Sequence, residues 1–277
     1  MDTSVATSTF VQERRGSNTV HHHRNVSAAD VLHILEEPGE VLKRSRKSLI
    51  RRAGPCVVKS SLPGVMGFLR LTFSRQRYRR GWVAAQHLEQ HGVGIPKTIA
   101  YVERGFLGLL FANHLVSEYL EGHRDSEQYL ARLINMGAGK VSVAAYLNNL
   151  AAAINALIDS GACHHDLSGK NIYTRDGENF LFIDLDDVSV GEPYTEELRL
   201  KNLVQLYDSY CDLLSDAVLV PFMLRLLPPD ADARVWMPKV RKGQQVRRRQ
   251  HEDKNPDAPR PMLRSQGTGA GGGASHS

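Results

Sequence analysis

Three side chains past the middle of the chain have the types and spacing that phosphoryl transfer requires. Residues 164–171 read His-His-Asp-Leu-Ser-Gly-Lys-Asn, which has the form H-x-D-L-x-x-x-N, and a later apolar run ends at Asp184. Asn171 follows Asp166 by five residues, and Asp184 follows Asn171 by 13. Phosphoryl transfer uses a carboxylate to accept the proton of the attacking hydroxyl, and oxygen ligands to hold a metal ion on the phosphates. We therefore predict that Asp166 is the catalytic base and that Asn171 and Asp184 bind the metal.

The segments around these residues predict the elements that must position them. An apolar stripe at helical spacing runs through residues 144–158 and ends before Gly161. Residues 172–175 and 180–183 read as two short strands on either side of the turn pair Asp176-Gly177. A helix, a polar loop, a hairpin and an acidic strand end follow one another in enzymes of the protein-kinase-like superfamily. Each residue alone could be a loop, turn or capping residue, but their combination favours a catalytic site.

The upstream part of the chain predicts strands with one helix, and the downstream part predicts helices. Strands are expected over residues 40–42, 56–59, 95–102 and 115–120, and a helix over 79–90. After Gly122 the pattern is mainly helical, with a second amphipathic stripe over residues 200–213. We predict an α+β fold of the protein-kinase-like, two-lobe type, with a β-rich N-lobe and a mainly α-helical C-lobe.

Composition sets the expected limits of these lobes. Residues 1–28 are polar, rich in Ser and Thr and without hydrophobic periodicity, so we expect a disordered tail. The nucleotide-binding N-lobe is expected over residues 29–121, and the C-lobe with the catalytic loop and metal site over residues 122–238. Residues 239–277 hold an arginine cluster, three prolines and a glycine-rich stretch, and we expect a second disordered tail there.

Four further residues are candidates for binding a nucleotide. Lys59 ends a strand that reads Cys-Val-Val-Lys, which resembles the V-A-I-K strand whose lysine binds the α- and β-phosphates of ATP. We therefore assign Lys59 to both catalysis and cofactor binding. Residues 116–122 resemble the hinge between kinase lobes, where backbone groups of Glu118 and Leu120 could bond adenine. Lys170 could approach the transferred phosphate or simply face water, and the predicted cofactors are ATP and Mg²⁺.

Several features of protein kinases are missing from the sequence. No glycine-rich G-x-G-x-x-G precedes Lys59, and no A-P-E follows Asp184. The helix after Lys59 lacks an obvious acidic partner for that lysine, because Gly81 lies near the expected place. Asp186 occupies the position of the glycine in D-F-G, and it could support the metal site, cap a helix or face solvent. These departures point to a small-molecule kinase, and they leave a catalytically impaired pseudokinase as an alternative.

The overall composition is that of a soluble protein with unevenly placed positive charge. Hydrophobic residues make up 42% of the chain, and no apolar run reaches the roughly 18 residues that span a bilayer. The three cysteines are far apart and fit reduced thiols, and the first ten residues lack the regions of a signal peptide. We therefore expect a cytoplasmic protein. Lys and Arg cluster over residues 43–52, 70–80 and 239–249, which suggests a polyanionic partner or a solvated surface. No nucleic acid is expected, because no nucleic-acid-binding motif accompanies these clusters.

Taken together, these motifs resemble the bacterial lipopolysaccharide kinase family, whose members include Kdo kinases and inner-core heptose kinases. The resemblance covers about residues 40–215 and rests on residues 79–104 and 115–122 and on the motifs at 164–171 and 183–186. It implies ATP, Mg²⁺ and transfer of the γ-phosphoryl group to a sugar hydroxyl, on Kdo or heptose, of the lipopolysaccharide core.

The same resemblance implies lipopolysaccharide core or a lipid A precursor as the acceptor. It also implies peripheral contact with the anionic, cytoplasmic face of the inner membrane, which the basic clusters would suit. A kinase for another small-molecule or protein acceptor, and a pseudokinase that acts as a binding module, are the alternatives that the sequence leaves open.

Overall fold

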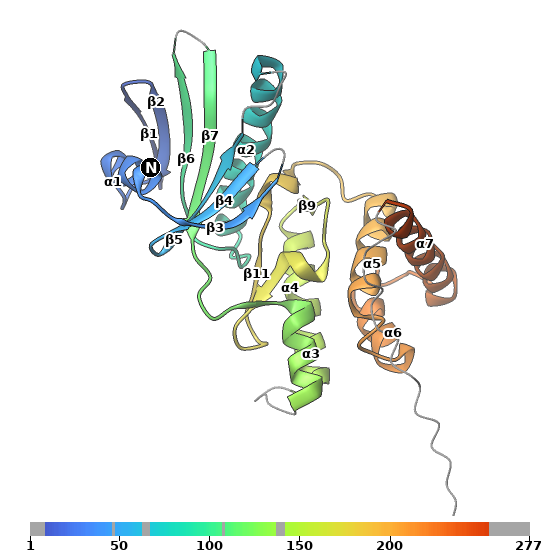
Figure 1. The fold of residues 1–277 in the computed structure, drawn as a ribbon. Helices are drawn as coiled ribbons and strands as arrows, with labels where there is room; N and C mark the ends of the chain where they lie inside the picture. Colours follow the sequence, from blue (N-terminus) through green and yellow to red (C-terminus); the bar gives the residue numbers. More distant parts are fainter. Residues whose placement is uncertain (1–8, 46–47, 63–66, 107–108, 137–141, 255–277) are drawn as a thin grey trace, which may run out of the picture.

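The computed structural model describes residues 9–45, 48–62, 67–106, 109–136 and 142–254. It has two parts, a β-sheet with two helices and a mainly helical part, which lie one above the other in Figure 1. Among the described residues, seven antiparallel strands form the sheet in the order β1-β2-β6-β7-β5-β4-β3. These strands are β1 (Phe10–Arg15), β2 (Asn18–His23), β3 (Glu40–Arg44), β4 (Ser48–Ala53), β5 (Cys56–Ser61), β6 (Thr98–Phe106) and β7 (Leu109–Glu118). The arrangement confirms the predicted α+β, two-lobe fold.

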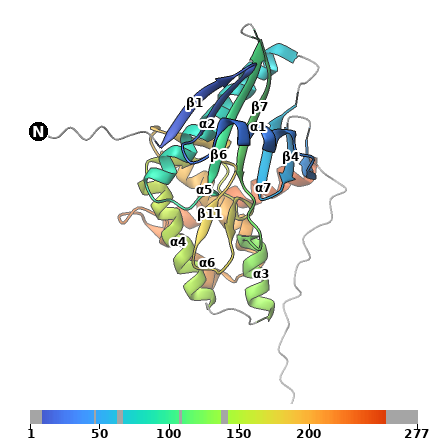
Figure 2. The same cartoon turned by 90° about the vertical axis from the view of Figure 1, so that its left-hand side faces the viewer.

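Two helices, α1 (Ala28–Glu36) and α2 (Gly67–Gln90), cover opposite faces of the sheet. Val102 of β6 packs in one buried cluster with Val31 of α1, whereas the neighbouring Tyr101 packs with Tyr78 and Trp82 of α2. Successive side chains of a strand point to opposite faces, so the two helices must lie on different sides. Figure 2 shows the sheet from a second direction, with the helical part below it.

The hairpin of β1 and β2 corrects the prediction of a disordered tail over residues 1–28. β2 pairs with β6, which places Val20 opposite Val102, and Val20 is fully buried. Gly16 in the turn takes a φ of +59°, a conformation that glycine adopts without strain. The local sequence of the hairpin shows little hydrophobic periodicity. It does not reveal the hairpin, because the stability of these strands comes from pairing with β6. Residues 1–8 lie outside the described part of the chain.

The second part of the molecule combines helices with short strands. Within the described residues its helices are α3 (Ser126–Met136), α4 (Val143–Asp159), α5 (Glu196–Tyr210), α6 (Asp216–Leu224) and α7 (Ala233–Lys254). Its strands are β8 (Arg124–Asp125), β9 (Ala162–His164), β10 (Ile172–Thr174), β11 (Phe180–Phe182) and β12 (Val188–Val190). β10 pairs with β8 and β11, and β9 pairs with β12. Helix α4 and the β10–β11 hairpin agree with the predicted helix and strands to within one residue at each end.

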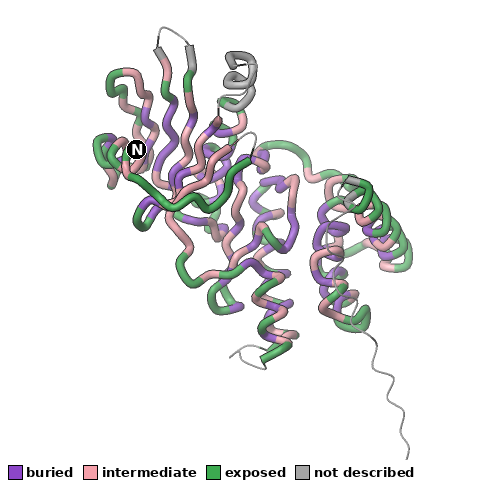
Figure 3. Tube along the Cα trace, viewed as in Figure 1, coloured by how far each residue is buried: buried purple, intermediate pink, exposed green. Residues whose placement is uncertain are grey.

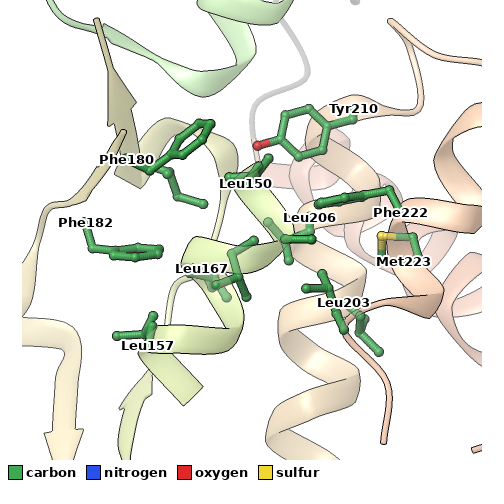
Figure 4. Packing of buried hydrophobic residues seen from close by; sticks show 14 of the residues in the cluster. Leu150, Leu157, Leu167, Phe180, Phe182, Leu203, Leu206, Tyr210, Phe222 and Met223 are labelled. Atoms are coloured by element: carbon green, nitrogen blue, oxygen red, sulfur yellow. The ribbon is translucent and has the colours of Figure 1, made fainter. Parts of the chain in front are cut away.

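A hydrophobic core joins α4, the β10–β11 hairpin, α5 and α6 (Figure 4). It includes Leu150, Leu157, Phe180, Phe182, Leu203, Leu206, Phe222 and Met223. Leu167, which follows the predicted base directly in the sequence, is also part of this core and is only 1% exposed. Burial of a leucine side chain contributes about 1.5–3 kcal/mol. The core therefore anchors the loop that carries Asp166.

Helix α7 corrects the prediction of a disordered tail over residues 239–277. The helix buries Trp236, Met237 and Val240 in the same core. Gly243 approaches α5 so closely that a Cβ atom at this position would lie 2.6 Å from Val204 Cγ2. The arginines after residue 238 made this segment look like a solvated run, although Val240 continues the buried face that Trp236 and Met237 begin. Residues 255–277 lie outside the described part of the chain.

Residues 119–123 carry the chain from the sheet to the helical part. The edge strand β3 is exposed along its whole length, as Figure 3 shows, whereas buried stretches lie in the centre of the sheet and along α4 and α5. The boundary between the lobes at residues 121 and 122 stays a proposal. In the ranges that the structure describes, no helix is both long and apolar enough to cross a membrane.

Candidate active site

Both oxygens of the Asp166 carboxylate accept hydrogen bonds. Asn171 Nδ2 donates to Asp166 Oδ2 at 3.0 Å and to the Asp166 carbonyl oxygen at 2.8 Å. Gln205 Nε2, from α5, donates to Asp166 Oδ1 at 2.9 Å. The half-buried carboxylate is therefore held in one orientation at the start of the predicted catalytic loop, residues 165–171. Because the Asn171 amide nitrogen faces Asp166, its Oδ1 remains the group that can act as a metal ligand.

His164 joins this loop to the segment that carries Asp184. The Asp166 amide donates to His164 Nδ1 at 3.2 Å, so the ring proton belongs on Nε2, which lies 3.0 Å from the Ile183 carbonyl oxygen. Burial lowers the pKa of His164, and it outweighs the opposite effect of the Ile183 carbonyl. A neutral His164 thus connects the loop with the residue before Asp184, a role that sequence alone did not distinguish from that of an ordinary loop histidine.

Asp184 has a strained backbone. Its φ of +61° lies in the left-handed region, and it is the sole non-glycine residue with a positive φ among those the structure describes. Such a conformation costs roughly 1–3 kcal/mol and is found where surrounding contacts impose it, often at functional sites. Here the chain leaves β11, passes Asp184 and enters a short 3-10 helix at Leu185–Asp187. The turn directs Asp184 and Asp186 to the same lysine.

Lys59 of β5 is paired with both carboxylates. Its Nζ lies 2.7 Å from Asp184 Oδ1 and 2.5 Å from Asp186 Oδ1. Burial alone would lower the pKa of Lys59, but the two carboxylates outweigh it and raise this pKa. Burial would likewise raise the pKa of Asp184, but the Lys59 ammonium outweighs it and lowers this pKa. Both groups are therefore charged near neutral pH.

Asp186 and Arg77 complete this cluster, and the sequence did not assign either role. The Asp186 side chain is 2% exposed and forms an ion pair with Arg77 of α2, which also lies 3.3 Å from Asp187. Asp186 is therefore not a solvent-facing residue, one of the three roles considered for it. It is the acidic partner of Lys59 that the sequence of α2 lacks.

Gly81 allows α2 to approach the turn at residues 184–187. A Cβ atom at Gly81 would lie 3.1 Å from the Asp186 amide nitrogen and 3.2 Å from its Cα. A larger residue, such as a glutamate, would push the helix away from the turn. The backbone of Asp186 thus fills the space that an acidic side chain at position 81 would need.

A cleft of about 600 Å³ lies between the sheet and the helical part, which suits a nucleotide. Its walls include apolar side chains from both parts, such as Ile50, Val57, Leu115 and Ile183. They also include six of the predicted site residues: Lys59, Glu118, Leu120, Lys170, Asn171 and Asp184. Lys170 is exposed at its edge. The structure thus brings together Lys59, Asn171 and Asp184 in one cleft, with Asp166 bonded directly to Asn171.

The predicted hinge also borders the cleft, at Glu118, Tyr119 and Leu120. The amides of Glu118 and Tyr119 donate to the carbonyl oxygens of Lys97 and Pro55, at 3.0 and 2.7 Å. These two amides are therefore occupied within the protein. Adenine recognition by backbone N–H groups would have to use Leu120, whose amide has no bond to another described residue.

The residues present fit a magnesium ion that is held largely by the nucleotide. Within the described ranges, no three His, Cys, Asp or Glu side chains converge as a metal site. Mg²⁺ is commonly bound through one or two carboxylates together with substrate phosphates, and rarely by an all-protein cage. One carboxylate, Asp184, and one amide oxygen, of Asn171, facing the cleft agree with that mode of binding.

This fold and this cleft define a phosphotransferase of the protein-kinase-like class. A profile of the lipopolysaccharide kinase (Kdo/WaaP) family matches residues 66–220, and the chain belongs to this family. The match confirms the resemblance stated from the motifs and makes the protein a lipopolysaccharide kinase by family.

One solved structure supports this fold. The chain is similar to "WaaP in complex with acyl carrier protein", with a TM-score of 0.57 and 18% identity over 81% of this chain and 92% of that one. A crystal structure of WbdD is matched with a TM-score of 0.47 and 16% identity, over 76% of this chain and 46% of that one. A search of curated protein sequences gave no match.

Proposed function

We propose that the protein is an ATP-dependent kinase that transfers the γ-phosphoryl group to a sugar hydroxyl, on Kdo or heptose, of the lipopolysaccharide core. One observation carries the proposal: Lys59, Asn171 and Asp184 border a single cleft, and Asn171 is hydrogen-bonded to Asp166, in a chain of the lipopolysaccharide kinase family. Phosphoryl transfer requires these groups and little covalent chemistry from the protein.

Asp166 acts as the base in this proposal. The Asn171 and Gln205 amides hold its carboxylate, and each carboxylate oxygen keeps a lone pair with which it can accept a proton. The acceptor hydroxyl would donate its proton to one of these oxygens while it attacks the phosphorus. Positioning of the hydroxyl and acceptance of its proton contribute to the rate together.

Four residues bind the nucleotide or its metal ion in this proposal: Lys59, Lys170, Asn171 and Asp184. Lys59 binds the phosphates from the sheet side, and Lys170 does so from the edge of the cleft. Bound ATP would supply the phosphoryl group and leave as ADP, and Mg²⁺ would neutralise part of the phosphate charge, with Asn171 and Asp184 as the protein ligands of the metal. The backbone of Glu118 and Leu120 would bind adenine, and the free amide of Leu120 is the donor available for it.

The structure weakens the case for a pseudokinase. One reason for that alternative was the lack of an acidic partner for Lys59, and Asp186 supplies this partner. The other was the lack of a glycine-rich loop. Between β3 and β4 the Ser45 amide donates to the Ser48 carbonyl oxygen at 2.9 Å, and residues 46–47 lie outside the described part of the chain.

Transfer of label from radioactive ATP to purified core oligosaccharide, in the presence of Mg²⁺, tests the proposed function. Label on the sugar supports it, and Asp166→Ala should reduce the rate by at least about 100-fold, the lower range for loss of a general base. Label only on protein or on soluble small molecules would favour another acceptor. Nucleotide binding without turnover on any acceptor would favour the pseudokinase.

Contact with the anionic inner membrane stays part of the proposal, since lipid A and the core would lie on its cytoplasmic face. Exposed basic residues such as Arg79, Arg80, Lys242 and Arg249 support it. Cosedimentation with anionic vesicles, compared with neutral ones, measures this contact.

A further inference from the structure

Gln205 is a buried polar residue on the face of α5 that packs against the catalytic loop. Gln205 is 4% exposed, and the neighbouring Leu203 and Leu206 belong to the hydrophobic core. Burial of a side-chain amide without hydrogen bonds costs roughly 1–3 kcal/mol, so such residues have partners that explain their presence.

Both partners of Gln205 belong to the catalytic loop. Its Oε1 accepts a hydrogen bond from the Leu167 amide at 3.0 Å, and its Nε2 donates to Asp166 Oδ1 at 2.9 Å. A backbone N–H can only donate, so the side-chain oxygen must face Leu167 and the nitrogen must face Asp166. The orientation of the amide is therefore determined by its surroundings, and Gln205 presents an N–H donor to the predicted base.

The loop is attached to α5 at a second point, one helical turn further on. Ser209 Oγ accepts a hydrogen bond from the Gly169 amide at 2.8 Å, and Ser126 Oγ donates to the Gly169 carbonyl oxygen at 2.7 Å. A Cβ atom at Gly169 would lie 2.7 Å from Glu127 Cγ, so the loop is closely packed here. These contacts hold the loop backbone, whereas only Gln205 of α5 also reaches the carboxylate of Asp166.

We propose that Gln205 is a positioning residue, which orients the Asp166 carboxylate toward the acceptor hydroxyl; this inference rests on the proposed kinase function. Asn171 holds Oδ2, and Gln205 holds Oδ1. With one donor on each oxygen, rotation of the carboxylate would break a hydrogen bond. Loss of the Gln205 donor frees this rotation, and a misplaced base loses rate without any change in nucleotide binding.

Steady-state kinetics of the full-length protein with ATP, Mg²⁺ and core oligosaccharide test the inference. Gln205→Leu should lower kcat by about 10–100-fold and leave the KM for ATP within about twofold, because the nucleotide contacts are unchanged. Gln205→Glu keeps an acceptor for the Leu167 amide but places a carboxylate against Asp166, so it should lose at least as much. Asn202→Leu is the matched control, since this amide is equally buried on α5 but donates to the Tyr194 hydroxyl.

A second measurement separates positioning from general damage to the loop. In an Asp166→Ala background, Gln205→Leu should leave the residual rate unchanged, because there is no carboxylate left to orient. The inference is overturned if Gln205→Leu lowers the rate of Asp166→Ala by the same factor as it lowers the rate of the wild type. Full activity of Gln205→Glu would overturn it too, and the kinase function would stand in both cases. If the wild-type protein turns over no acceptor and no ATP, both fail together.

Discussion

At the scale of single residues, the central finding is where the acidic partner of Lys59 comes from. In protein kinases this lysine pairs with a glutamate of the following helix. Here that helix, α2, presents Arg77 and Gly81, and the carboxylate comes from Asp186, two residues after Asp184. The ion pair between Arg77 and Asp186 connects α2 to the turn at residues 184–187, so the position of the helix and the charges of the site depend on one buried carboxylate.

Asp186→Asn should lower the free energy of unfolding by about 3 kcal/mol, because it leaves Lys59 and Arg77 with less compensation for their charges. Activity should fall with it, since Lys59 loses one of its two partners. Urea denaturation measures the stability. Asp187→Asn is the control, since its side chain is 40% exposed and lies 3.3 Å from Arg77, and it should change stability by less than about 1 kcal/mol. Equal effects of the two substitutions would argue against a special role for Asp186.

The sequence predicted those site residues that belong to a short, contiguous motif. Asp166 and Asn171 lie five residues apart, and their spacing alone indicated that they act together. Gln205 lies 39 residues after Asp166 on a helix whose pattern predicts only burial, so its contact depends on how α5 packs. A polar residue within an apolar stripe was the one available signal. Arg77 gave no signal, because an arginine on a basic helix is usually solvated.

At the scale of elements, the interior of each predicted helix and strand was easier to infer than the ends of the fold. Helix α4 has strong periodicity and a serine cap, with Ser142 Oγ accepting from the Ala145 amide at 3.2 Å. The β1–β2 hairpin and α7 were missed because each is stabilised by a partner far away in the sequence, β6 for the hairpin and α5 for the helix. Local composition carries little information about such partners.

A pair of valines on α7 tests whether this helix is part of the core. Val240 is fully buried and Val246 is 46% exposed. Val240→Ala should lower the free energy of unfolding by roughly 2 kcal/mol through the cavity that it leaves. Val246→Ala should stay within about 0.5 kcal/mol. Urea denaturation measures both free energies of unfolding. If α7 does not pack on α5, the two substitutions should change this free energy by equally small amounts.

His114 on β7 should make the sheet sensitive to acid. Burial, followed by the charges of Arg104 and Arg51, lowers the pKa of His114 to about 4 from an ordinary value of 6.5. In the unfolded chain this histidine binds a proton at about pH 6.5, whereas in the folded protein it stays neutral until about pH 4. The free energy of unfolding should therefore fall as the pH is lowered through this window.

Thermal unfolding of His114→Asn between pH 7 and 4 checks this expectation. The variant should lose less stability on acidification than the wild type does, because its side chain binds no proton. His33→Asn serves as the control, since the His33 side chain is 75% exposed. Parallel pH profiles for wild type and His114→Asn would contradict the assignment.

At the scale of the whole molecule, the basic clusters are less available to a partner than the sequence suggests. Arg51 donates to three backbone carbonyl oxygens at the end of α1, and the Arg52 guanidinium lies 4.0 Å from the centre of the Tyr119 ring. Arg248 is paired with Asp208 and with Asp212. Much of the positive charge thus holds elements of the fold together, and an anionic partner would meet the remaining, exposed part.

The central claim is that this chain phosphorylates the lipopolysaccharide core with Asp166 as the base. The most direct test is the mass spectrum of lipopolysaccharide from a bacterial strain that lacks the gene, after complementation with the wild type or with Asp166→Asn. Wild type should restore one phosphate on a core Kdo or heptose, and Asp166→Asn should leave that sugar unphosphorylated although the protein is folded. Identical spectra from the deletion and wild-type strains, or full restoration by Asp166→Asn, would contradict the account.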